Sequence, residues 1–173
     1  IRTFLDQARW GVMAVTSDEG QPFVNSNLYV YDRDRHCVYT HTARTGRTPD
    51  LMAAPRQVCF TTSEMGRLLP ADEALEFSVE YAGVVIFGTG YTVEDQVEAQ
   101  AALQGLLDKY APHLAPERDY RGITPEEMKR TRVYRIDVED WSGKEKVVED
   151  DFPGAFRVPA PAILAGPFRG AAE

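Results

Sequence analysis

The chain has 173 residues, of which 43% are hydrophobic and 10% aromatic, enough for one globular domain with its own core, which excludes a disordered or fibrous chain. Its 27 acidic residues outnumber its 19 basic residues, so the net charge is -8. This balance disfavours contact with nucleic acid, because neutralising phosphates requires a basic face. No apolar run approaches the ~20 residues of a membrane span and no signal sequence is visible, although a leader before Ile1 could be missing.

Cysteine usage indicates the redox compartment. Cys37 and Cys59 lie inside apolar, strand-like runs and lack CxxC spacing. We interpret them as buried small side chains rather than as a disulfide or a metal site. Because free thiols are typical of a reducing environment, we expect a cytoplasmic protein.

In chain order, strands dominate the predicted elements. Six runs have the composition of strands, at residues 10–16, 22–32, 36–42, 57–64, 75–93 and 132–141. The first three predict an antiparallel meander. Helical patterns occur at residues 1–9, 49–54 and 93–112, and at a capping box that starts at Thr124. The third helix is expected to bury one stripe, formed by Val97, Ala101, Leu103, Leu106, Leu107 and Tyr110. Residues 65–74 and 142–144 are expected to be turns.

The longest strand, at residues 75–93, is apolar on both faces at its centre, which is typical of a barrel or a packed dimer. Gly83, Gly88 and Gly90 do not indicate a phosphate-binding glycine loop, because the sequence continues as strand instead of turning into a helix. We expect these glycines to let the strand bend as a small barrel closes. The elements together predict a mainly β (α+β) antiparallel barrel of six strands with short peripheral helices.

The last 25 residues differ in composition from the rest of the chain. Residues 149–173 contain four prolines yet keep several large apolar side chains. Two interpretations stay open: an arm that lies over the domain or over a partner subunit, and a disordered tail. The predicted boundary separates a barrel domain, residues 1–148, from this Pro-rich C-terminal segment.

No side chain in the sequence indicates direct catalysis. Its three histidines, at positions 36, 41 and 113, lack metal-ligand spacing, so we predict no metal site. A serine hydrolase is disfavoured because there is no GxSxG elbow, and Ser78 lacks an identifiable base. Carboxylate runs occur in turns or on a solvated helix face, where they usually serve solubility.

One loop of this acidic chain is basic. The stretch "HTARTGR", residues 41–47, contains no carboxylate. Arg44, Arg47, the hydroxyls of Thr42 and Thr45 and the backbone N–H groups near Gly46 are the donors that a flavin phosphate requires. The alternative is a polar loop before a helix whose arginines point to solvent.

Four stretches, in order, carry a family resemblance: "PFVNSNLYVYDRDRHCVYTHTARTGRTPDLMAAPRQVCF", "SEMGRLLP", "LEFSVEYAGVVIFGTG" and "MKRTRVYRIDVEDWSGKE". They resemble the pyridoxamine 5'-phosphate oxidase-like split-barrel superfamily, and within it the Nim-type nitroimidazole reductases. The likeness covers Ile1 to about Val147. It implies a split β-barrel with Greek-key topology, and a homodimer that holds FMN at the subunit interface.

The resemblance also implies roles for individual residues. Cofactor-binding residues would come from one strand, with Asn25, Ser26 and Asn27, from a second strand end, with Thr40, His41 and Thr42, and from the loop, with Arg44, Gly46 and Arg47. Arg47 matches the phosphate-binding residue. A second basic residue often lies close before it in the family; Arg44 sits three residues earlier, where it could serve or could point away. His41 matches the Nim-type histidine that faces cofactor and substrate and is the candidate catalytic residue; a surface histidine is the alternative. Trp141 and Lys144 match the closing motif, and packing and turn roles explain them equally well.

The resemblance favours an FMN-dependent oxidoreductase that passes electrons to a small organic acceptor, for which a nitroaromatic is a candidate. We do not predict pyridoxamine phosphate oxidation, because "WSGKEKVVEDDF" lacks the Arg and His that hold that substrate. A non-catalytic protein that binds FMN, a deazaflavin or haem is the first alternative, since a neutral His41 could ligate iron. A dimeric regulatory protein whose site has decayed is the second.

Overall fold

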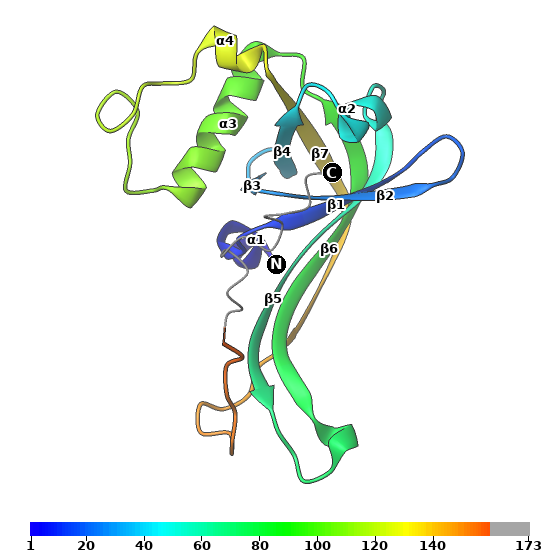
Figure 1. Ribbon diagram of the computed structural model, residues 1–173, viewed down its shortest axis with the longest axis vertical. Helices are drawn as coiled ribbons and strands as arrows, with labels where there is room; N and C mark the ends of the chain where they lie inside the picture. The colour runs from blue at the N-terminus through cyan, green and yellow to red at the C-terminus, as the bar shows by residue number, and fades with distance from the viewer. Residues whose placement is uncertain (160–173) are drawn as a thin grey trace, which may run out of the picture. The chain divides into compact units, whose positions relative to one another are not determined.

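The computed structural model describes residues 1–159 (Figure 1). Its helices are short apart from α3, and they comprise α1 (Arg2–Gln7), α2 (Arg47–Leu51), the 3-10 turn η1 (Ala74–Glu76), α3 (Gln96–Tyr110) and α4 (Pro125–Met128). Its strands are β1 (Gly11–Thr16), β2 (Pro22–Asn27), β3 (Tyr29–Asp32), β4 (Cys37–Ala43), β5 (Arg56–Leu69), β6 (Ser78–Thr92) and β7 (Thr131–Lys146). The predicted mainly β class is therefore confirmed.

All seven strands belong to one sheet, in the order β2-β1-β5-β6-β7-β4-β3. The count of six and the meander were wrong, because residues 22–32 form two strands instead of one. β2 pairs with β1, and β3 pairs with β4, so the two halves of that run lie at opposite ends of the strand order. The break falls at Leu28, whose carbonyl accepts a hydrogen bond from the Thr40 hydroxyl at 3.0 Å.

Two predicted turns are strand in the structure. β5 continues to Leu69, through the first half of the expected turn at 65–74, and β7 continues to Lys146, through the expected turn at 142–144. Gly66 and Gly143 lie in these strands, and a glycine that packs closely in a strand does not end it. Local turn chemistry was therefore outweighed by pairing with neighbouring strands.

α3 lies inside the range predicted as helix, but it buries only part of the predicted stripe. Asp95 caps it by accepting a hydrogen bond from the backbone N–H of Glu98 at 2.8 Å. The helix buries Ala99, Ala102 and Leu106, whereas Val97, expected in the buried stripe, is 79% exposed. Small alanines let the helix lie close to β3 and β4, as Figure 1 shows.

The core has two parts, one on each face of β4. The larger part includes Phe60, Val38, Tyr134 and Ile136 between the sheet strands. The smaller part lies beneath α3 and includes Cys37, Tyr39 and Val133. Because successive residues of a strand point to opposite faces, this division determines what each site residue of β4 faces.

The described residues form two compact units, one of Ile1–Glu64 with Ala82–Lys144 and the other of Met65–Tyr81 with residues 145–159. Within the second unit, Arg67 forms an ion pair with Glu80 at 2.7 Å and donates to the carbonyls of Val148, Glu149 and Asp150. The predicted domain boundary at residue 148 stays a prediction. Residues 160–173 of the predicted C-terminal segment lie outside the described residues.

The Arg67–Glu80 pair predicts an acid-sensitive segment. Hydrogen bonds from the Arg67 side chain and backbone and from the Val148 N–H lower the pKa of Glu80 from 4.5 to about 2. A carboxyl group with a depressed pKa stabilises the fold above its ordinary pKa, and this contribution is lost as the pH falls toward the folded value. We expect the hydrogen-exchange protection of the Val148 amide to fall between pH 4.5 and about 2. Glu80→Gln should remove this pH dependence, and the exposed Glu145→Gln should preserve it.

Candidate functional site

The basic loop connects the end of β4 to α2, and its backbone requires glycine. Gly46 precedes the first residue of α2 with a φ of 124°, a conformation that other residues rarely adopt. A Cβ placed there would meet no atom within 4 Å, so the backbone faces open space. Among residues 1–159, no side chain forms a capping hydrogen bond to this helix. The N–H groups at the start of α2 are therefore available to an external acceptor.

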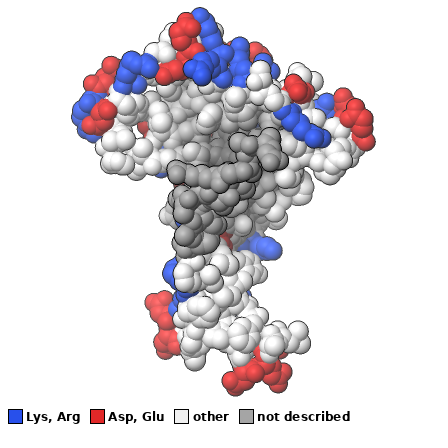
Figure 2. Space-filling model, in the orientation of Figure 1, with Lys and Arg blue, Asp and Glu red and all other residues white. Residues whose placement is uncertain are grey.

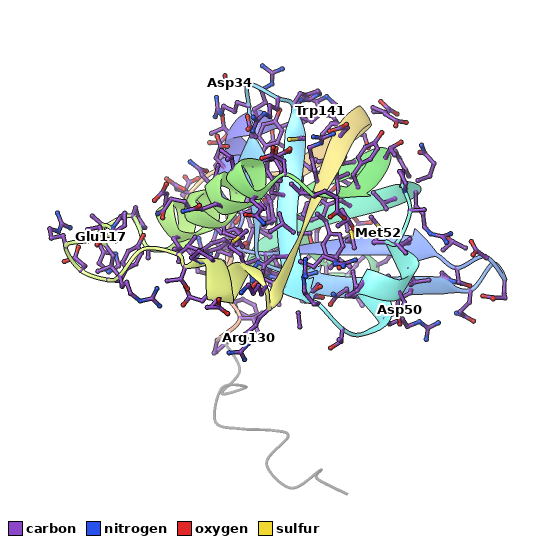
Figure 3. All side chains as sticks on the ribbon, turned by 90° about the horizontal axis from the view of Figure 1, so that it is seen from above. Asp34, Asp50, Met52, Glu117, Arg130 and Trp141 are labelled. Atoms are coloured by element: carbon purple, nitrogen blue, oxygen red, sulfur yellow. The ribbon has the colours of Figure 1, made fainter. Side chains whose placement is uncertain are left out.

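Side chains from β2 lie beside this loop. The Arg47 guanidinium lies over the ring of Phe23, with 5.2 Å from Cζ to the ring centroid. Asn25 donates from Nδ2 to the hydroxyl of the buried Thr48 at 3.0 Å. These contacts bring together residues that are more than twenty positions apart in the sequence, and Figure 3 shows α2 through its labelled Asp50.

Arg44 and Arg47 form no ion pair within residues 1–159. More than half of the other arginines in this part of the chain do, and they are Arg9, Arg33, Arg35, Arg56, Arg67, Arg118, Arg121 and Arg135. Both arginines of this loop are exposed, without such a partner in the same range. They are two exposed cations that can attract an external anion to this loop.

β4 places its predicted site residues on opposite faces. Thr40 is buried with its hydroxyl on the Leu28 carbonyl, and the Thr42 hydroxyl lies 3.0 Å from the Tyr134 hydroxyl. His41 points the other way, toward the face that α3 covers. The structure therefore does not bring His41 and Thr42 together within one chain.

His41 lines a pocket of about 390 Å³ between β4, α3 and the segment before α4. The other lining side chains are mainly apolar or aromatic, with Leu28, Leu103, Leu107 and Tyr110 among them. The His41 Nδ1 atom is buried and has no hydrogen-bond partner among the described residues. Burial lowers the pKa of His41, so the imidazole is neutral at pH 7.

The predicted site residues of β2, Asn25, Ser26 and Asn27, also point to alternate faces of the sheet. Asn25 and Asn27 are half-buried on the side of Phe23, and Ser26 is exposed on the opposite side. The Asn27 Nδ2 atom is buried without a partner in the described part of the chain. Ser26 therefore does not share a face with the two asparagines that flank it.

The sequence did not single out Phe23, Thr48 or Tyr134, since each is an ordinary core or helix residue until its neighbours are known. Trp141 packs against His36, with ring centroids 4.6 Å apart, and against Tyr31, which gives it a role in packing. Within residues 1–159, no three His, Cys, Asp or Glu side chains are grouped so that they could hold a metal ion. No helix in this range has the length and apolar character needed to cross a bilayer.

Several solved structures share the fold. The flavocytochrome Anf3 from Azotobacter vinelandii has a TM-score of 0.71 and 20% identity, covering 91% of this chain and 77% of that chain. An FAD- and haem-binding protein from Mycobacterium smegmatis has a TM-score of 0.73 and 19% identity, with coverages of 86% and 71%. A candidate 5-nitroimidazole antibiotic resistance protein from Bacteroides thetaiotaomicron has a TM-score of 0.67 and 19% identity, with coverages of 83% and 80%.

The split-barrel architecture is thereby confirmed. A comparison with curated protein sequences gave no match. The family model for pyridoxamine 5'-phosphate oxidase matches residues 1–145, which confirms the resemblance seen in the sequence motifs. The chain therefore belongs to the pyridoxamine 5'-phosphate oxidase family, whose split-barrel fold holds flavin or haem cofactors in its structural relatives.

Proposed function

We propose that this protein binds a flavin, with FMN as the expected form, and passes electrons through it to a small organic acceptor. The observation that carries this proposal is the loop at Gly46 and Arg47, where an open backbone with positive φ meets a guanidinium that forms no ion pair within residues 1–159. Backbone N–H groups and an arginine are a suitable donor set for a phosphate. A flavin held there would supply electron or hydride transfer at its ring.

The chain's own residues would bind and orient that group. Arg47 and the first N–H groups of α2 would hold the phosphate, and Asn25 would be kept in position by Thr48. Asn27, with its unpartnered Nδ2, offers a hydrogen bond to a ring carbonyl. Ser26 and His41 do not face the side of β2 that carries Asn25 and Asn27. These two residues would therefore contact a cofactor held by a second chain, or the acceptor, which is consistent with a homodimer that shares the cofactor.

Electron transfer is the test of this function. Protein loaded with FMN under anaerobic conditions should lose its oxidised flavin absorbance on addition of NADH or NADPH, and should recover it when a nitroaromatic or quinone is added. Free FMN at the same concentration is the control. A loaded protein that accelerates neither step over free FMN would contradict the oxidoreductase proposal and would leave a flavin-binding protein.

Haem binding is a second candidate, and His41 is the observation that favours it. A neutral imidazole with an unpartnered nitrogen in a mainly apolar pocket is a suitable ligand for haem iron. Two proteins of this fold are named as haem-binding or as a flavocytochrome. Haem, FAD and a deazaflavin are therefore alternatives to FMN, alone or together with it.

The histidine predicts a specific spectroscopic result. If haem binds at His41, addition of haem should produce a Soret band in wild-type protein, and His41→Ala should shift the band or abolish it. Since protonated imidazole cannot ligate iron, the band should be stable near neutral pH and lost in acid. His113→Ala, an exposed histidine outside the pocket, is the matched control. A band that is unchanged in His41→Ala would refute this placement.

A further inference from the structure

A basic pocket lies where β4 ends and β7 begins, and the function proposed above does not use it. It has a volume of about 230 Å³ and is lined from the loop, from the end of β6, from α4 and from the start of β7. Three cations line it, Arg44, Lys129 and Arg132. Figure 2 shows blue side chains gathered over α4, with red ones among them.

These three cations form few or weak interactions with the rest of residues 1–159. The Arg132 Nε atom is buried and has no hydrogen-bond partner among residues 1–159, and Arg44 is exposed without an ion pair in the same range. Lys129 contacts Glu126 at 2.7 Å, but both side chains are largely exposed. An exposed pair of this kind contributes ~0–1 kcal/mol, so Lys129 can exchange its partner easily. A buried guanidinium nitrogen without a partner is costly, and a bound anion would satisfy it.

The pocket also contains an acceptor. Glu94 is the one carboxylate among the residues that line this pocket. The neighbouring Asp95 does not line it and caps α3. Cations beside a single carboxylate suit a phosphate attached to a ribose, in which the phosphate contacts the guanidinium groups and a ribose hydroxyl donates to the carboxylate. The volume is below the roughly 300–1,000 Å³ of pockets that enclose a drug-sized ligand, so the pocket fits this part of a nucleotide and not a whole flavin.

The basic loop, residues 41–47, contributes both to this pocket, through Arg44, and to the proposed flavin phosphate site, through Arg47. Arg44 and Arg47 are three residues apart, and three extended residues span at most about 11 Å. One ligand of dinucleotide length can therefore contact both, and so can two ligands bound side by side. Arg44, predicted to share the flavin phosphate with Arg47, lines this pocket, while Arg47 lies over Phe23.

We propose that Arg44, Arg132 and Lys129 form a second anion site, which binds the ribose-phosphate part of an adenine nucleotide. This proposal deepens the flavin function and rests on it for its purpose. Two sources share this chemistry: the adenylate half of FAD, and a nicotinamide nucleotide that delivers electrons. In both cases the site selects a nucleotide by its phosphate, and it places that nucleotide beside the flavin loop.

The test uses calorimetric titration of the full-length protein with ADP and, separately, with FMN. ADP should bind wild-type protein. Arg44→Gln and Arg132→Gln should each weaken ADP binding about tenfold, because each removes a charged hydrogen bond, and Arg132→Gln should change FMN affinity less than about twofold. Arg130, labelled in Figure 3, lies between α4 and β7 and does not line the pocket, so Arg130→Gln should change neither affinity. Arg44 is exposed, so its substitution does not endanger the fold.

The two sources are distinguished by repeating the titration with FAD and NADPH. A loss of FAD affinity in Arg132→Gln identifies the flavin as the source, and a loss of NADPH affinity identifies the electron donor. The proposal is overturned if ADP does not bind to protein that binds FMN, or if Arg130→Gln weakens ADP as much as Arg132→Gln does. It is also overturned if Arg132→Gln weakens FMN as strongly as Arg47→Gln, since the pocket would then be part of the flavin site. If the protein binds ADP but binds no flavin, the proposed function is contradicted and the anion site is not.

Discussion

Arg47→Gln is expected to weaken FMN binding by about ten- to a hundredfold. A hydrogen bond to a charged group contributes roughly 1.5–3 kcal/mol, and each 1.4 kcal/mol changes an affinity tenfold. Glutamine keeps a polar side chain of moderate length but removes the charge. The quenching of flavin fluorescence on binding measures the dissociation constant directly.

The same substitution should leave the fold intact. Arg47 is exposed, and its described contact is the cation–π interaction with Phe23, worth roughly 0.5–1 kcal/mol at an exposed site. The thermal midpoint should therefore change little, so that weaker binding cannot be attributed to unfolding. Arg47→Lys should retain more FMN affinity than Arg47→Gln, because lysine keeps the positive charge but cannot form the bidentate hydrogen bonds of a guanidinium. Equal FMN affinity in wild-type and Arg47→Gln would exclude the loop as the phosphate site.

Gly88→Ala should destabilise the protein strongly, by about 3 kcal/mol or more. A Cβ at Gly88 in β6 would lie 1.9 Å from the backbone carbonyl oxygen of Asp137 in β7. Backbone in the middle of a paired sheet cannot move aside as a flexible side chain can, so the two strands would have to separate locally. Chemical denaturation of the purified variants measures the free energy of unfolding.

Gly105→Ala is the matched control. Gly105 lies inside α3, and its Cβ would meet Val30 at 3.5 Å, an ordinary van der Waals contact. Since alanine favours a helix over glycine by ~0.8–1.0 kcal/mol, this variant should be slightly more stable than wild type. If Gly88→Ala and Gly105→Ala were equally stable, the close approach of β6 and β7 would be wrong.

The sequence predicted well where a local pattern determines the structure. The capping box at Thr124 forms as expected, with Glu127 bonded back to the Thr124 N–H at 2.8 Å. Gly46 was assigned to the basic loop from its sequence context, and its positive φ is what a residue without a Cβ can adopt. The long strand at residues 75–93 was predicted from its apolar length, and β6 occupies most of that range.

Non-local pairing explains what the sequence could not predict. Residues 22–32 keep the same alternation on both sides of Leu28, so no local signal shows that β2 and β3 pair with different strands. The buried face of α3 is likewise chosen by its packing on β3 and β4, and not by its most apolar stripe.

The candidate site shows the same limit. The loop residues were predicted together because they are adjacent, whereas the contact of Asn25 with Thr48 joins residues that only the fold brings close. His41 and Thr42 are also adjacent, and for that reason a strand directs them to opposite faces. The apolar pocket around His41 depends on side chains of α3 from Leu103 to Tyr110, more than sixty residues later in the chain, so no motif near His41 could indicate it.

The most direct test of the flavin proposal is an absorption spectrum with mass spectrometry of the cofactor, recorded on full-length protein after incubation with FMN and removal of the unbound flavin. We predict oxidised flavin bands, with FMN retained in proportion to the protein and lost in Arg47→Gln but not in Arg130→Gln. A protein that retains no FMN, FAD or deazaflavin under these conditions would contradict the account.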